Sequence, residues 1–229
     1  MAPAVQPGQE PQTARLVTEA TTSQGLVDTA GKVRLWLNGA LGFGFANVDV
    51  GVTTGGETVS LRGGGGIGLG AGAGYGLSRK FDLDVDLGFQ LSGESPAVDN
   101  ATASFGRGFL LATIKYKIPT SDSGQFKLGL GVGEYFGGKL DVDTRSGAFG
   151  HHDIVKYNSA TGFHCTGEFE RFLRPNLSFS LGAKVYFVKY KADSYTRNDL
   201  ELPVSTLPDK ERNLDGSGMD VMISLSTYF

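Results

Sequence analysis

The sequence of 229 residues predicts an all-β protein, an eight-stranded antiparallel up-and-down transmembrane β-barrel. Three observations lead to this prediction. Eight segments alternate apolar and polar residues with the period of a β-strand. The connections between these segments are alternately short and long. The charged residues of the strands fall on one face and the apolar residues on the other. Together these features are typical of a closed barrel in lipid, with turns on one side and loops on the other.

Residues 1–31 are rich in Pro, Gln, Thr, Ala and Gly, and we expect them to form a flexible extension. The barrel is then expected over residues 32–229. Its eight strands are expected at residues 32–48, 59–77, 81–91, 107–118, 126–136, 155–169, 177–189 and 219–229. Short turns fall at 78–80, 119–125 and 170–176, and longer polar loops fall at 49–58, 92–106, 137–154 and 190–218. An even number of strands puts both termini on the side of the short turns.

The alternation is clearest at residues 81–91, where Asp82, Asp84 and Asp86 alternate with apolar residues. Residues 64–76 carry a glycine at every even position, and glycines also mark the polar face of residues 126–136. Residues 155–169 form the least regular segment. Aromatic residues gather toward both ends of the apolar face, as expected for side chains at the level of lipid headgroups.

Closure of the sheet in lipid would invert the pattern of a soluble barrel, because the apolar face points out and the charged face points in. The residues expected in the lumen are Arg62, Asp82, Asp84, Asp86, Arg107, Lys115, Lys117, Lys127, His164, Glu168, Lys184 and Asp220. Opposite charges at similar heights on neighbouring strands predict ion pairs there. We expect Asp82 and Asp84 near Lys115 and Lys117, and Lys127 near Glu168 and Glu170. Eight strands leave room for little beyond side chains, which favours a plugged lumen over a narrow water-filled passage. Trp36 also points inward by its position, for which the sequence offers no reason.

Composition excludes several classes of protein. A formal net charge of −3 gives no electrostatic case for nucleic-acid binding. Cys165 is the single cysteine, so no internal disulfide can form. No apolar run is long enough for a membrane-spanning helix. The start of the chain lacks the basic and apolar stretches of a signal peptide, and we interpret it as a mature chain with an added Met.

Motifs that carry chemistry are weak in this sequence. Residues 63–68 match G-x-G-x-x-G, but no strand-to-helix turn surrounds them, so a dinucleotide site is not expected. Asp141 and Asp143 begin like a calcium loop, yet Arg145 takes the third ligand position. His151 and His152 lie together without further ligands at fixed spacing, so we expect no metal and no cofactor.

Two further residues, His164 and Cys165, carry groups that are common in catalysis. His164 points inward beside Thr166 and Glu168, which favours a hydrogen-bonded lumen residue over a catalytic base. Cys165 points to the opposite face of the strand, so the two cannot form a Cys–His pair.

The terminal strand, residues 219–229, alternates two faces and stops on the aromatic Phe229. A chain with such an end resembles the outer-membrane β-barrel proteins of Gram-negative bacteria, and its plan is similar to the OmpA, OmpX and OmpW group. The resemblance covers about residues 32–229. It implies a bacterial outer-membrane location and a periplasmic place for residues 1–31. It also implies contact with membrane lipid and lipopolysaccharide, and recognition of Phe229 by the barrel assembly machinery.

The resemblance implies a structural or surface-interaction protein whose long loops meet an unknown partner, and not an enzyme. Two alternatives stay open. A narrow channel for small solutes or ions would depend on lumen charges such as Arg62 and Lys184. A lipid A-modifying enzyme would need a Ser–His pair with an acidic residue near the outer rim, for which Ser159 and His152 are candidates.

Overall fold

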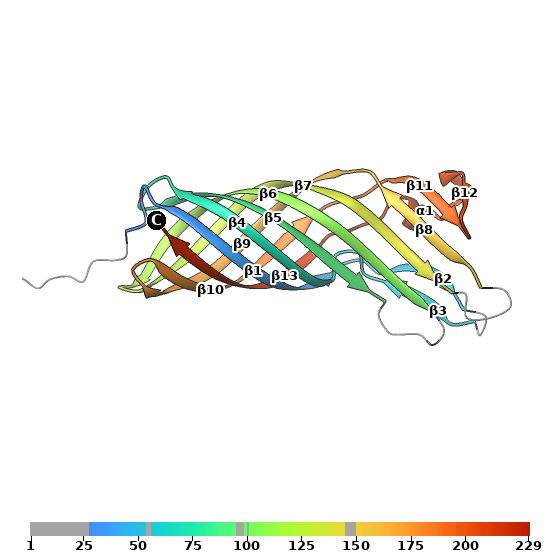
Figure 1. Cartoon of the computed structure of the whole chain (residues 1–229), viewed down its shortest axis with the longest axis horizontal. Helices are drawn as coiled ribbons and strands as arrows, with labels where there is room; N and C mark the ends of the chain where they lie inside the picture. Colours follow the sequence, from blue (N-terminus) through green and yellow to red (C-terminus); the bar gives the residue numbers. More distant parts are fainter. Residues whose placement is uncertain (1–27, 54–55, 95–98, 100, 145–149) are drawn as a thin grey trace, which may run out of the picture.

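The structure is a computed structural model that describes residues 28–53, 56–94, 99, 101–144 and 150–229. Eight of its strands close into a barrel (Figure 1). These are β1 (Val33–Gly44), β4 (Gly66–Gly76), β5 (Phe81–Gly93), β6 (Thr102–Ser121), β7 (Gly124–Asp143), β9 (Ala160–Arg174), β10 (Leu177–Phe187) and β13 (Gly218–Tyr228). Each pairs antiparallel with the barrel strands before and after it, and the all-β, eight-stranded up-and-down prediction is confirmed.

Two pairings close the barrel. Leu37 of β1 lies opposite Leu225 of β13, and Leu130 of β7 lies opposite Cys165 of β9. The predicted extension at residues 1–31 lies outside the described residues except for residues 28–31. Within that piece, the Gly31 backbone N–H donates to the Gly76 carbonyl at 2.7 Å, which holds the entry of the chain against the turn end of the barrel.

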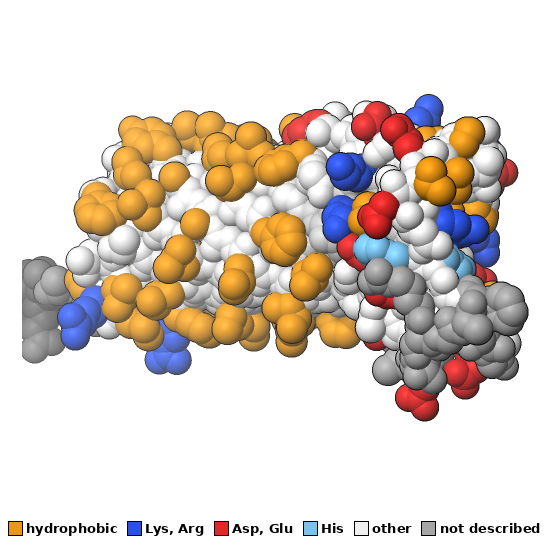
Figure 2. All heavy atoms as spheres, turned by 45° about the vertical axis from the view of Figure 1, so that its right-hand side comes forward, with side chains coloured by type: hydrophobic (Ala, Val, Ile, Leu, Met, Phe, Trp, Pro, Cys, Tyr) orange, Lys and Arg blue, Asp and Glu red, His pale blue; other side chains and the backbone are white. Residues whose placement is uncertain are grey.

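The outer wall of the barrel is apolar. Leu37 and Leu69 are each 70% exposed, and similar side chains cover the barrel surface in Figure 2. In water such a surface would be very unfavourable, whereas in lipid it is the expected one. Every strand of the closed wall has a hydrogen-bonded neighbour on both sides, as a chain in lipid requires. The barrel is therefore built to span a membrane. Among the described residues, no helix has the length and apolar character to cross one.

Beyond the barrel the chain forms a second structure, which we call the dome (Figure 1). It contains residues 102–107 of β6 and 137–143 of β7, which run on past the barrel. To these the chain adds β2 (Val48–Val52), β3 (Thr58–Leu61), β8 (His152–Tyr157), β11 (Ala192–Arg197), β12 (Leu200–Leu202), η1 (Val204–Thr206) and α1 (Asp209–Arg212). Strands β8, β11 and β12 extend the sheet from β7, while β2 and β3 form a separate hairpin.

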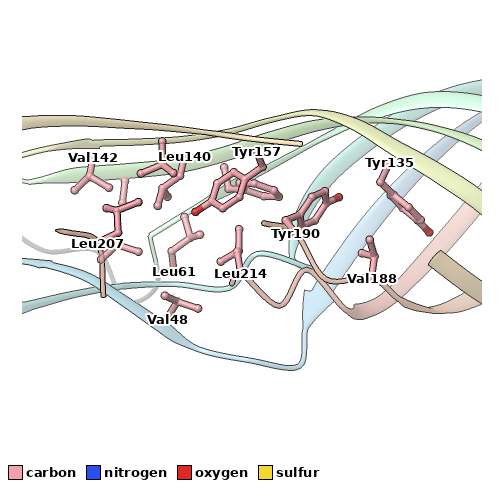
Figure 3. Packing of buried hydrophobic residues seen from close by; sticks show 14 of the residues in the cluster. Val48, Leu61, Tyr135, Leu140, Val142, Tyr157, Val188, Tyr190, Leu207 and Leu214 are labelled. Atoms are coloured by element: carbon pink, nitrogen blue, oxygen red, sulfur yellow. The ribbon is translucent and has the colours of Figure 1, made fainter. Parts of the chain in front are cut away.

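The dome has a hydrophobic core of the kind found in soluble proteins. Figure 3 shows Val48 and Leu61 of the hairpin side facing Leu140 and Tyr157 of the extended sheet. Phe105, Tyr157 and Tyr190 form a three-ring cluster with centroids 5.5 to 6.0 Å apart. Edge-on aromatic contacts of this type add to the free energy gained from burial. The dome is therefore a packed structure and not a set of separate loops.

These observations correct three predictions about the loops and strands. Residues 59–77 were expected to form one strand, but β3 ends at Leu61 and β4 begins at Gly66. Val59 and Leu61 are fully buried in the dome, whereas their alternation predicted contact with lipid. Residues 137–154 and 190–218 were expected to be polar loops, yet they contain the end of β7, the start of β8, and β11, β12 and α1. The reason is that these segments cover each other, so that their apolar side chains can be buried away from water.

Candidate functional site

The candidate site is the interior of the barrel, which holds the charged residues. At the end with the short turns, eight ionised side chains form what we call the lower ion network. Its members are Arg34, Asp82, Asp84, Lys115, Lys117, Lys127, Glu168 and Glu170. Four cations face four carboxylates, and every one of these side chains is at most 8% exposed. Because the charges balance, the cluster can stay ionised in a place that excludes water.

Strand register explains how this network forms. Inward positions alternate along each strand, so Asp82 and Asp84 of β5 share a face, and Asp82 lies directly opposite Lys115 of β6. Lys127 of β7 lies opposite Glu168 of β9 in the same way. The side chains also form ion pairs with residues that are not directly opposite in the register, since Lys117 Nζ lies 2.6 Å from Asp82 Oδ1. Opposite charges on adjacent strands thus meet because the barrel places them at one height.

Lys127 is the most enclosed cation of the network. Its Nζ lies 2.8 Å from Glu170 Oε2 and 3.1 Å from Asp82 Oδ2. The Glu170 carboxylate in turn accepts hydrogen bonds from Ser178, Tyr228 and Gln125 at 2.5 to 2.7 Å. Every oxygen of Glu170 therefore has a donor, which offsets the cost of burying its charge.

Arg34 joins the network from β1. Its guanidinium lies 2.6 Å from Asp84 Oδ2 and 3.3 Å from Glu168 Oε1, and its Cζ lies 4.3 Å from the centre of the Trp36 ring. The Trp36 indole N–H donates to Asp86 Oδ1 at 2.7 Å. Trp36 thus points into the lumen, where it stacks on a cation and satisfies a carboxylate. The sequence alone provided no account of this residue.

Above the network lies a small cavity of about 30 Å³ lined by polar side chains from opposite walls. His164 Nε2 lies 2.8 Å from Thr113 Oγ1, while His164 Nδ1, Thr166 Oγ1 and Ser226 Oγ have no partner among the described residues. A space of this size accommodates about two water molecules. Water hydrogen-bonded to these orphaned atoms would satisfy them, whereas an organic solute would not fit.

A second polar cluster closes the barrel beneath the dome. Lys184 Nζ lies 2.9 Å from Asp220 Oδ2, and Gln90 donates to the other oxygen of Asp220 at 2.9 Å. Arg107 donates to Gln90 Oε1 at 2.6 Å and to the Gly216 carbonyl at 2.7 Å. The Arg107 guanidinium also lies 4.8 Å from the centre of the Tyr186 ring. The apolar core of the dome begins directly above, with Phe105 and Leu214 fully buried.

Eleven of the twelve residues predicted for the lumen lie inside the barrel, with ten buried and Asp86 lining the cavity. Arg62 is the exception and the prediction is wrong for it. Arg62 is exposed in the connection between β3 and β4, where it donates to Asn47 Oδ1 at 3.0 Å. The strand does not continue through residues 62–65, so its alternation could not carry Arg62 into the lumen. Arg34 and Glu170, both central to the network, were missing from the predicted set.

The histidines of the dome bind different carboxylates. His151 Nε2 lies 3.2 Å from Asp153, and His152 Nε2 lies 2.8 Å from Asp141. The described residues contain no group of three His, Cys, Asp or Glu side chains able to hold a metal ion. Ser159 is exposed, and in the described part of the chain it makes no hydrogen bond to His152.

The remaining motifs lie in unremarkable settings. The glycines at 63–68 lead into β4 and not into a helix. Asp141 binds Lys139 and His152, while Arg145 of the calcium-like pattern lies outside the described residues. Cys165 is exposed on the apolar outer wall. Phe229 ends the chain beside β1, where its backbone N–H donates to the Val33 carbonyl at 2.9 Å, and its side chain is exposed.

Comparisons with known proteins agree with this architecture. No protein-family model matches the chain, and no curated protein matches its sequence. Among solved structures, the outer membrane protein OprG from Pseudomonas aeruginosa is similar, with a TM-score of 0.55 and 17% identity over 90% of this chain and 98% of that one. Neisserial surface protein A is similar with a TM-score of 0.51 and 11% identity, over 87% of this chain and 99% of that one. The chain therefore has the fold of the small outer-membrane β-barrels.

Proposed function

We propose that this protein is an integral protein of a bacterial outer membrane whose sealed barrel anchors the dome at the cell surface in a structural or surface-interaction role. The observation that carries the proposal is the closure of the barrel interior at both ends. Charged and polar side chains fill the lumen, and the apolar core of the dome covers it. A barrel closed in this way anchors a surface structure, and within the described residues the dome is the part left to meet partners outside the cell.

The fold and the distribution of connections support the orientation. In outer-membrane barrels the short turns face the periplasm and the long connections face outward. The dome is built from the long connections, so it lies outside the cell in this proposal. Membrane lipid and lipopolysaccharide would then surround the apolar wall. Recognition of Phe229 by the assembly machinery and the partner of the dome stay predictions.

The proposal predicts that the purified full-length protein shows no stable conductance steps in a planar lipid bilayer. Arg34 and Lys127 would have to leave their carboxylates before ions could pass, and the dome core would have to open. A general porin measured in the same bilayer serves as the positive control. Stable, reproducible steps from this protein would contradict the proposal.

A narrow channel is the second candidate, and the cavity beside His164 favours it, because it leaves polar atoms available for water inside the barrel. In that case Lys184→Gln should change the ratio of cation to anion current, because Lys184 lines this cavity. Arg62→Gln is the matched control, because Arg62 lies outside the lumen. Conductance that responds to Lys184 and not to Arg62 would establish the channel.

A further inference from the structure

The dome contains a pocket that is separate from the barrel interior. Its volume is about 350 Å³, and it is lined by residues of β2, β8, β11 and β12 together with the segment that contains η1 and α1. Figure 1 shows α1, β11 and β12 side by side at this end of the molecule. Pockets for small organic ligands begin at about 300 Å³ and combine apolar walls with a few polar groups. The size of this pocket is therefore that of a ligand site, unlike the cavity in the barrel.

One wall of the pocket carries a fixed group of polar side chains. Asp153 is buried, and both of its carboxylate oxygens accept hydrogen bonds from Arg197 at 2.8 Å. Tyr195 donates to Asp153 at 3.2 Å, and His151 Nε2 lies 3.2 Å from it. This two-pronged contact matches the positive charge of Arg197 with the negative charge of Asp153, so the pair has no net charge to offer a ligand.

Glu211 of α1 supplies a second carboxylate to the same pocket. Within the described residues this carboxylate accepts no hydrogen bond and belongs to no ion pair; the contact from Tyr157 goes to the Glu211 backbone carbonyl. The negative charge of Glu211 is therefore unpaired, because the charges of Asp153 and Arg197 neutralise each other. Leu202, Leu207 and Pro208 form apolar lining beside it. The pocket thus joins one unmatched negative charge to an apolar surface.

We propose that this pocket binds a small organic cation, an ammonium or amidinium group carried on an apolar body. The cationic head would pair with Glu211 and the body would pack against Leu202, Leu207 and Pro208. An anionic ligand would be repelled by the unmatched carboxylate of Glu211. The inference does not depend on the proposed function, because the pocket lies outside the barrel interior and would bind its ligand whether or not the lumen conducts.

Three probes with the same body and different charge test the proposal on the refolded full chain in detergent micelles at about pH 8, where the Glu211 carboxyl group is mostly ionised. They are 2-phenylethylammonium, 2-phenylethanol and phenylacetate, each followed by amide chemical shifts of residues that line the pocket. We expect saturable shifts with the cation, about tenfold weaker binding of the neutral alcohol, and none of the acid. Equal binding of all three probes, or no binding of the ammonium, would overturn the proposal.

Variants locate the binding within the molecule. Glu211→Gln keeps the shape of the side chain and removes its charge, and it should weaken binding of the ammonium about tenfold. Glu201→Gln is the matched control, because Glu201 is exposed on β12 and does not line the pocket. Thr206→Trp places a large ring at the pocket wall and should abolish binding of both the cation and the alcohol. Unchanged binding in either pocket variant would show that the probes bind elsewhere.

Discussion

The barrel and the dome are built from the same sheet and have opposite interiors. In the barrel, charges lie inside and leucines face out; Leu130 of β7 is 68% exposed. In the dome, Leu140 of the same strand is fully buried and Lys139 beside it is exposed. The difference follows from what surrounds each region, since lipid accepts apolar side chains and water accepts charges. In β7 the two rows of side chains exchange sides, because even-numbered residues face outward in the barrel and inward in the dome.

A β-bulge makes this exchange in β7. Gly106 pairs with Lys139 and Gly108 pairs with Phe136, so Gly137 and Gly138 together face the single residue Arg107. The extra residue shifts the alternation of β7 by one, so that its even-numbered side chains face outward in the barrel and inward in the dome. Gly137 has φ +62°, a backbone conformation that favours glycine. In strand β6 the same face points inward throughout. This face carries Lys117 and Lys115 in the barrel and Phe105 in the dome.

The largest expected effect comes from breaking the lower ion network of the barrel. Lys127→Met removes a cation that neutralises Asp82 and Glu170, and it leaves these carboxylates buried without it. We expect a loss of about 3–5 kcal/mol in the free energy of unfolding. Urea unfolding in detergent, followed by the fluorescence of Trp36, measures the barrel directly, because Trp36 is the single tryptophan and lies in the lumen.

Lys139→Met in the dome is the matched control for this comparison. Lys139 also contacts a carboxylate, Asp141 at 2.7 Å, but its side chain is 47% exposed. An exposed pair of this kind contributes about 0–1 kcal/mol. If the two substitutions cost the same, the charges of the barrel would not be enclosed as the structure has them.

A smaller effect is expected where the two regions meet. Gly137→Ala places a side chain at positive φ with open space around it, so the cost comes from the backbone alone. We expect a loss of about 1–2 kcal/mol. The loss should appear as faster hydrogen exchange in β8 and the end of β7, while the barrel strands keep their protection.

Gly93→Ala provides the control, because its side chain would also meet open space and its φ is not positive. Equal effects of the two substitutions would show that the bulge does not need glycine. Faster exchange throughout the barrel in Gly137→Ala would show instead that dome and barrel unfold together.

Period-2 alternation was sufficient to predict the barrel. A strand between lipid and a polar lumen has one apolar and one polar face, so each residue of β5 could be assigned to a side from sequence position alone. The same rule places Arg34 on the inward side of β1, although Arg34 was not included in the predicted lumen set. Glu170 was expected near Lys127, as the structure has it, but it was assigned to a turn and left out of the lumen set, whereas β9 continues to Arg174.

The dome could not be predicted in this way. Alternation does not say whether an apolar face meets lipid or another segment, so Val59 and Leu61 were assigned to the outer wall although they are buried in the dome. The bulge at Gly137 inverts the faces without changing the period on either side of it. The contacts that bury these faces join segments far apart in the chain, such as β3 and β6, and no local pattern encodes them.

The smallest expected effect concerns pH and separates the dome from the barrel. Burial in the pocket and the nearby charge of Asp153 raise the pKa of Glu211 to about 7, while Arg197 opposes this shift. The folded dome therefore holds this proton more tightly than the unfolded chain, whose Glu has a pKa of about 4.3. The resulting stability is present below the unfolded pKa and is lost as pH rises through about 7. After allowance for solvent screening, we expect a loss of about 1 kcal/mol between pH 5 and pH 8.

Hydrogen exchange of β2 and β11, corrected for the intrinsic effect of pH, measures this loss in the dome. Glu211→Gln cannot ionise, so it should flatten the pH dependence and be more stable than the wild type at pH 8. Glu201→Gln, on the exposed strand β12, should keep the slope of the wild type. If Glu211→Gln keeps the full slope, the carboxylate is not confined beside Asp153. In that case the charge assigned to the pocket would be absent, and of the two described regions the barrel alone would have ionised groups enclosed in its interior.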